Sequence, residues 1–90
     1  MKHPTEVEKY SGTLEELAVD VCNLRYDRLS DFLRYCSNEI ASQAGADSGR
    51  GRLKLALSLS YLARGLNRAK TLTDKVWKIC GPYMKDLPSE

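Results

Sequence analysis

The side chains that most often carry out chemistry are few in this chain and poorly spaced for it. Its 90 residues include one histidine, His3, and three cysteines, Cys22, Cys36 and Cys80. A structural zinc site needs Cys and His ligands at short, clustered spacings, and these cysteines are 14 and 44 residues apart. Each falls on an apolar helical face, where a free thiol behaves as a small hydrophobic group. We therefore expect no metal site and no bound cofactor.

Other catalytic patterns are also incomplete. The run Gly49 to Arg52 has the composition of a phosphate-binding loop, but the Lys-Ser or Lys-Thr that should follow it is missing. The Glu-x-x-His pairs of a di-iron helical bundle are absent from the sequence. A general base near pKa 7 or an activated nucleophile is what catalysis at neutral pH normally needs. The sequence therefore predicts no catalytic residues, and a protein that is not an enzyme.

Composition predicts one domain that benefits from association. The chain is 42% hydrophobic and 29% charged, and 90 residues give a small core. No apolar run approaches the roughly 20 residues needed to cross a bilayer, so we expect no membrane contact. Residues 1–11 carry five charged or histidine side chains and no apolar stretch of the signal-peptide type. A cytoplasmic location is the resulting expectation.

Local signals divide the chain into two long helices. Thr13 to Glu16 forms a capping box, which predicts a helix over about 13–44. The glycine-rich stretch 45–51 predicts a turn, and a second helix follows over about 52–80, ended by Gly81 and Pro82. Residues 1–12 are predicted to be a flexible tail, residues 13–84 a single helical-hairpin domain, and residues 85–90 a C-terminal tail.

The second helix has one alternative. Thr71 and Thr73 are β-branched, and Asp74 could cap a new helix, so a break at 71–74 would leave a short third helix. The apolar residues Leu72, Val76 and Ile79 stay in phase with the preceding stripe. This continuity favours the unbroken helix.

Apolar residues repeat every 3.5 positions along both predicted helices, which is a heptad pattern. The stripe of the second helix comprises Leu55, Leu59, Leu62, Leu66, Ala69, Thr73, Val76, Cys80 and Tyr83. The stripe of the first comprises Ala18, Cys22, Tyr26, Leu29, Leu33, Cys36 and Ile40. With its neighbours, the first stripe covers about half of the helix circumference, which is more than one partner helix can bury.

These stripes predict an all-α fold, a long αα-hairpin that dimerises into an antiparallel four-helix bundle. The candidate dimer contacts are Leu17, Arg25, Phe32, Tyr35, Glu39 and Trp77. Arg25 of one chain could meet Glu39 of the other if a two-fold axis lay near Phe32. The alternative is that Arg25 lays its methylenes on the core and both charged groups reach water.

Charge is divided between the two halves of the chain. Residues 1–48 carry five basic and nine acidic side chains, a net charge of −4, whereas residues 49–90 carry nine and three, a net charge of +6. Opposite stripes of this kind are typical of solvated helix faces that favour correct pairing. They could also bind phosphates. The candidate residues for an anionic partner are Arg50, Arg52, Lys54, Tyr61, Arg64, Arg68, Lys75 and Lys78.

The sequence as a whole predicts a small non-enzymatic interaction protein with an adaptor, assembly or regulatory role. Its expected partner is a second copy of itself, and another protein could instead place an amphipathic helix on the wide face of the first helix. The alternative function is a nucleic-acid-binding regulator that uses the basic stripe. Salt separates these hypotheses, because phosphate binding weakens steeply as salt rises and an apolar contact persists.

Overall fold

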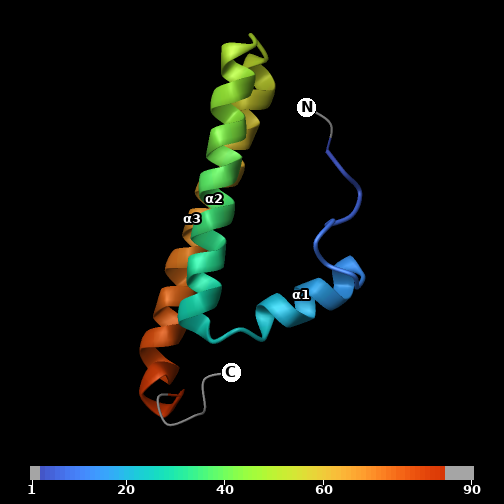
Figure 1. Ribbon diagram of the computed structural model, residues 1–90. Helices are drawn as coiled ribbons and strands as arrows, with labels where there is room; N and C mark the ends of the chain where they lie inside the picture. The colour runs from blue at the N-terminus through green and yellow to red at the C-terminus, as the bar shows by residue number, and fades with distance from the viewer. Residues whose placement is uncertain (1–2, 85–90) are drawn as a thin grey trace.

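The computed structural model describes residues 3–84 and contains three helices: α1 (Leu14–Cys22), α2 (Tyr26–Gly49) and α3 (Leu53–Met84). The α2 and α3 helices lie side by side as a long antiparallel hairpin, and α1 leaves the hairpin at the end opposite the α2–α3 turn (Figure 1). The all-helical class is confirmed, with no strand among the residues described. No helix within residues 3–84 is long and apolar enough to cross a membrane.

The capping box begins α1 as predicted. The Thr13 hydroxyl accepts a hydrogen bond from the Glu16 backbone N–H at 3.1 Å, and the Glu16 carboxylate accepts from the Thr13 backbone N–H at 2.9 Å. Before it, Tyr10 donates its hydroxyl hydrogen to the Asp20 carboxylate. The preceding residues and α1 therefore form one N-terminal arm, which we define as residues 5–22.

The prediction of one continuous helix over 13–44 is wrong, because the chain breaks at residues 23–25. The Asn23 N–H still bonds to the Val19 carbonyl and ends α1, while Arg25 is extended and caps α2. The Arg25 guanidinium donates two hydrogen bonds to Asp27, at 2.7 and 2.9 Å, and lies 5.5 Å from the centroid of the Trp77 ring. Contacts to a residue on α3 thus hold the break open.

The turn is shorter than the predicted range 45–51. The α2 helix continues through Gly49, and the chain reverses over Arg50, Gly51 and Arg52. Gly51 alone among the described residues has a positive φ, +80°, a conformation that glycine adopts without strain. Asp47 holds the turn, because its carbonyl accepts from the Arg52 N–H at 2.9 Å and its carboxylate pairs with Arg50 and Arg52.

The predicted stop of the last helix at Gly81 and Pro82 is also wrong, since α3 continues to Met84. Gly81 is buried against the Trp77 indole, where an added Cβ would lie 3.2 Å from the ring. Pro82 falls in the last turn, where its missing N–H removes a single helical hydrogen bond. The helix is unbroken at 71–74, as favoured above. The predicted C-terminal tail, residues 85–90, lies outside the described residues.

The α2–α3 contact, which we call the inner seam, combines small and polar buried residues with half-buried larger ones such as Leu33, Ile40 and Trp77. Its buried members include Ser30, Ala44 and Asp47 on α2, and Ala56, Ala63 and Gly81 on α3. On α3 the buried and half-buried positions Ala56, Ser60, Ala63, Lys70, Asp74, Trp77 and Gly81 follow heptad spacing one residue after the predicted leucine stripe. One residue is a rotation of 100° about the helix axis. Leu55 and Leu62 of that stripe are therefore exposed beside the contact, whereas Leu59 and Leu66 are half-buried at its edge.

Candidate functional site

The hairpin has two long flanks, one on each side of the inner seam. In an antiparallel helix pair, positions just before the seam on both helices lie on one side, and positions just after it lie on the other. The first side is the apolar flank: Leu29, Phe32, Cys36, Leu55, Leu59, Leu62, Leu66 and Val76. The second is the basic flank of α3: Lys54, Tyr61, Arg64, Arg68, Lys75 and Lys78.

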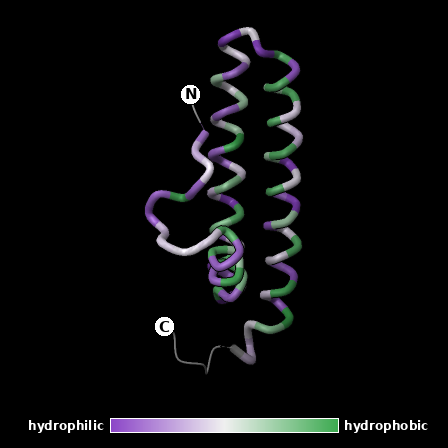
Figure 2. The backbone as a smooth tube through the Cα atoms, turned by 90° about the vertical axis from the view of Figure 1, so that its right-hand side faces the viewer, coloured by the Kyte–Doolittle hydropathy of each residue, from purple (hydrophilic) through white to green (hydrophobic). Residues whose placement is uncertain are grey.

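The apolar flank is wide and largely uncovered. The exposed fractions are 40% for Phe32, 47% for Leu55, 49% for Leu62 and 42% for Val76. Helix packing in the described chain is between α2 and α3. The α1 helix is in front of the lower end of α2 in Figure 2 and projects away from the hairpin in Figure 1. Cys36 is half-buried here, and burial raises the pKa of its thiol. The thiol is therefore protonated near neutral pH and acts as an apolar group.

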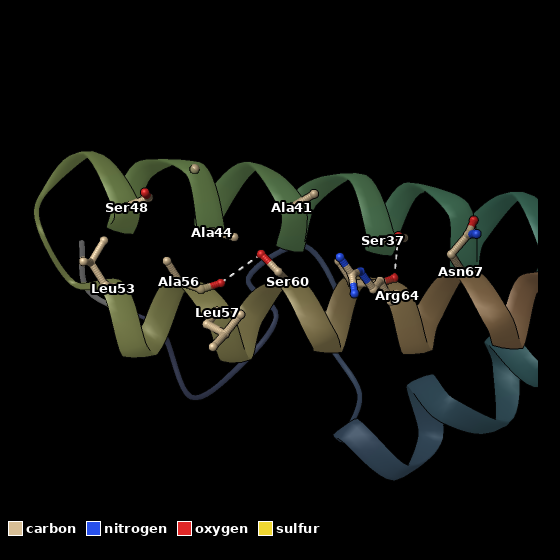
Figure 3. Close-up of a pocket in the computed structure, with 12 residues that line it drawn as sticks. Ser37, Ala41, Ala44, Ser48, Leu53, Ala56, Leu57, Ser60, Arg64 and Asn67 are labelled. Carbon is tan, nitrogen blue, oxygen red and sulfur yellow. Dashed lines mark hydrogen bonds between the residues drawn. The ribbon is translucent and has the colours of Figure 1, made fainter.

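The opposite side of the seam is a shallow groove near the turn (Figure 3). Small residues line it, including Ala41, Ala44 and Ser48 from α2, and Leu57 and Arg64 lie along α3. Two of its hydroxyl groups bond within the hairpin: Ser37 donates to the Ala63 carbonyl at 2.8 Å and Ser60 to the Ala56 carbonyl at 3.0 Å. The other polar side chains of the lining are those of Ser48, Arg64 and Asn67.

One polar cluster crosses the seam nearer the other end. Buried Ser30 donates to the Asp74 carboxylate, and Lys70 donates to the same group at 2.7 Å. The Lys70 ammonium and the Ser30 hydroxyl hold the pKa of Asp74 below its usual value. The cluster fixes the register of α2 against α3. Among residues 3–84, no three His, Cys, Asp or Glu side chains are grouped as metal ligands.

The charges of the hairpin are unevenly neutralised. On α2, Asp27 pairs with Arg25, and Asp31 pairs with two arginines of its own helix. Arg50 and Arg52, predicted to face an anionic partner, instead pair with Asp47 at the turn. The basic residues of the hairpin that form no salt bridge with any described residue are Lys54, Arg64, Arg68, Lys75 and Lys78. Uncompensated positive charge therefore lies along one flank of α3.

The predicted dimer contacts do not form one patch within a single chain. Phe32 and Glu39 lie two turns apart on the apolar side of α2, and Tyr35 is on its outer surface. Leu17 is on the arm and Trp77 is in the inner seam. The Arg25 guanidinium is held by Asp27 and Trp77, and Glu39 lies 3.4 Å from the Gln43 amide. Arg25 thus has partners within its own chain.

Sequence reasoning missed the residues that build the inner seam. Ser30, Ser37 and Asp74 bond across the hairpin, and none of them was among the positions predicted for the helix contact. Their spacing carried a usable signal, because Ser30, Ser37 and Ala44 repeat every seven residues, as do Ala56, Ala63, Lys70 and Trp77. A second heptad of small and polar residues beside an apolar one marks a close helix contact.

The fold defines the class of protein: a helical hairpin with an N-terminal arm, whose candidate sites are extended surfaces. Searches against protein-family models, curated proteins and solved structures found no match for this chain.

Proposed function

We propose that the protein acts by binding protein surfaces, and that its first partner is a second copy of itself. Two hairpins that place their apolar flanks face to face would form an antiparallel four-helix bundle, with helices crossing at about 20°. Such a dimer would serve an adaptor, assembly or regulatory role through its remaining surfaces.

The observation that supports this proposal is the contrast between what the hairpin buries and what it leaves exposed. Its buried hydrophobic residues are the alanines Ala44, Ala56 and Ala63, and no large side chain of the described residues is fully buried. Each buried methylene-sized group contributes about 0.8 kcal/mol, so the fully buried part of the core is weak. Leu55 and Leu62, which could add to it, are about half exposed on the apolar flank, and Leu59 and Leu66 are half-buried there.

A charge placed on that flank tests the proposal. Leu62→Asp should convert a dimer into a monomer in light scattering behind size exclusion, because a carboxylate cannot be buried unpaired at low cost. Ser42→Asp is the matched control, since Ser42 is exposed on the outer surface of α2, and it should leave the mass unchanged. Two variants with the same mass and the same dissociation constant would contradict a dimer built on this flank.

Nucleic-acid binding is a second candidate, favoured by the unpaired cations of the basic flank. From Lys54 to Lys78 the row extends for about 36 Å at 1.5 Å per residue. Tyr61 is 57% exposed, and the Arg64 guanidinium lies 5.6 Å from its ring centroid. Because this flank is opposite the apolar one, it would stay accessible in the proposed dimer.

Salt titration of single-stranded RNA binding tests this candidate. Each phosphate contact adds about 0.7 to the slope of log affinity against log salt. Arg68→Gln should lower that slope, whereas Arg50→Gln, which removes an arginine already paired with Asp47, should lower it less. RNA binding that is absent at low salt, or equal losses in both variants, would remove the candidate.

A further inference from the structure

The N-terminal arm contains a helix that packs little against α2 and α3. Its Leu14 and Leu17 share a hollow with Val7 and Tyr10 of the same arm, and Leu17 and Val21 are half-buried. The α1 helix has nine residues and buries none of them, and Leu14 is 62% exposed. Leu14, Leu17, Ala18 and Val21 repeat on one face of this helix. Isolated helices shorter than about 12–15 residues are marginal in water even for good sequences. A nine-residue amphipathic helix therefore needs a surface against which to pack.

Residues 23–25, which we call the hinge between α1 and α2, set the direction in which the arm leaves the hairpin. Arg25 bonds to Asp27 and covers Trp77, so the chain at residues 23–25 is tied to the base of the hairpin. From there α1 projects sideways, away from α2 and α3 (Figure 1).

An apolar surface that suits α1 lies on the outer side of α3. Leu72 and Ile79 are one heptad apart on the side of α3 that faces away from α2, with exposed fractions of 49% and 75%. We call this pair the outer rim. Arg68 and Lys75 each precede a rim residue by four positions, and so lie beside it on the helix surface.

The charges of α1 and of the residues beside the outer rim are also complementary. The α1 helix carries Glu15, Glu16 and Asp20 and has no basic residue. Arg68 and Lys75 form no salt bridge with any described residue. A helix that is apolar on one face and acidic at its edges fits a rim that is apolar and bordered by cations.

The direction of the arm indicates which copy supplies the rim. The α1 helix projects away from α2 and α3 of its own chain (Figure 1), and the outer rim is on the side of α3 that faces away from α2. In this arrangement α1 does not contact its own outer rim.

We propose that α1 of one copy packs Leu14, Leu17 and Val21 on the outer rim of a second copy. The exchange is mutual in a two-fold dimer, and it requires the two hairpins to bring their arm-bearing ends together. This inference rests on the proposed self-association. It adds a specific role for the arm, that of clasping the partner hairpin.

Paramagnetic broadening in mixed dimers tests the clasp. The probe is a nitroxide at Val19→Cys, on the exposed face of α1, in an unlabelled chain whose three native cysteines are replaced and whose mass matches the wild type. This chain is mixed with ¹⁵N-labelled chain that carries no nitroxide. We expect broadening of the amides from Leu72 to Ile79, whereas a nitroxide at Ser42→Cys should leave them sharp.

Each other outcome overturns the inference at a defined point. A monomeric wild-type mass would overturn both the clasp and the proposed self-association. A dimer without broadening at 72–79 would overturn the clasp and leave self-association in place. Broadening seen only when nitroxide and ¹⁵N are in the same chain, diluted with unlabelled chain, would show that the arm docks on its own hairpin.

A variant gives an independent readout. Leu14→Gln should weaken the dimer about tenfold or more, because it removes most of the apolar contact of one leucine. Val19→Gln, which changes a residue on the opposite face of the same helix, should leave the dissociation constant unchanged. Equal dissociation constants for the two variants would contradict the packing of this face.

Discussion

Two sides of α3 differ in chemistry. The inner seam includes the small residues Ala56 and Ala63, which are buried beside α2. The apolar flank, 100° away, presents leucines to solvent. Small residues suit a contact where two backbones approach closely, and large ones suit a contact that must supply binding free energy. The comparison teaches that the strongest apolar pattern in a sequence need not coincide with the closest helix contact inside the chain.

The largest expected effect is at the flank. Leu62→Ala should lower the free energy of unfolding of the dimer by about 2–3 kcal/mol per chain, the cost of emptying a buried leucine site. Leu57→Ala is the matched control, since Leu57 has a similar exposed fraction but lies on the other side of the seam. Leu57→Ala should lower the free energy of unfolding by about 0.5 kcal/mol. Urea denaturation measures both, and equal losses would erase the distinction between the two sides.

The inner seam should be destabilised by added side-chain volume, whereas the flank should be destabilised by lost volume. Ala63→Leu adds a large side chain where Ser37 bonds the Ala63 carbonyl, and should destabilise the protein by about 1–3 kcal/mol in urea denaturation. The control is Gly65→Ala, two residues away, where an added Cβ meets nothing within 4 Å. It should stabilise the protein by about 0.5–1 kcal/mol. If Ala63→Leu were neutral, the close approach of α2 and α3 would be contradicted.

The smallest expected effect is the acid sensitivity of the seam. The pKa of Asp74 is lowered by Lys70 and Ser30 from its usual value of 3.8, so the folded state favours the ionised carboxylate. Its contribution is present above pH 3.8 and is lost as the pH falls through the lowered pKa. Unfolding followed by circular dichroism from pH 5 to pH 2 should show a smaller acid-dependent loss in Asp74→Asn than in wild type. The same loss in both proteins would mean that protonation of Asp74 is not coupled to unfolding.

The sequence predicted those features that depend on neighbouring residues. The capping box at Thr13 and Glu16 is a local pattern, and it formed as expected. The turn was located to within a few residues by its glycines, of which Gly51 uses the conformation that glycine favours. The hairpin also followed, because two apolar periodic segments around such a turn have few other ways to pack.

The features that the sequence did not reveal depend on distant contacts. The break at 23–25 is held by Arg25 against Trp77, 52 residues away, and the apolar period passes through it in phase. The extension through Pro82 is instead a local feature that the helix-stop pattern missed, since Gly81 packs against Trp77, four residues earlier in the same helix. Two adjacent heptad patterns on α3 could each face α2. Which of them does depends on how closely the two backbones approach, and residue hydrophobicity does not indicate that distance. The sequence identified the candidate basic residues by their charge, but it did not show that two of them form salt bridges at the turn.

Sedimentation equilibrium of the wild-type chain, in low and in high salt, tests the central claim that the apolar flank is the contact between copies. The account predicts twice the chain mass of 10.1 kDa in both buffers, because burial of apolar surface is not weakened by salt. A mass of 10.1 kDa in both buffers, at every protein concentration at which the chain is folded, would contradict the claim.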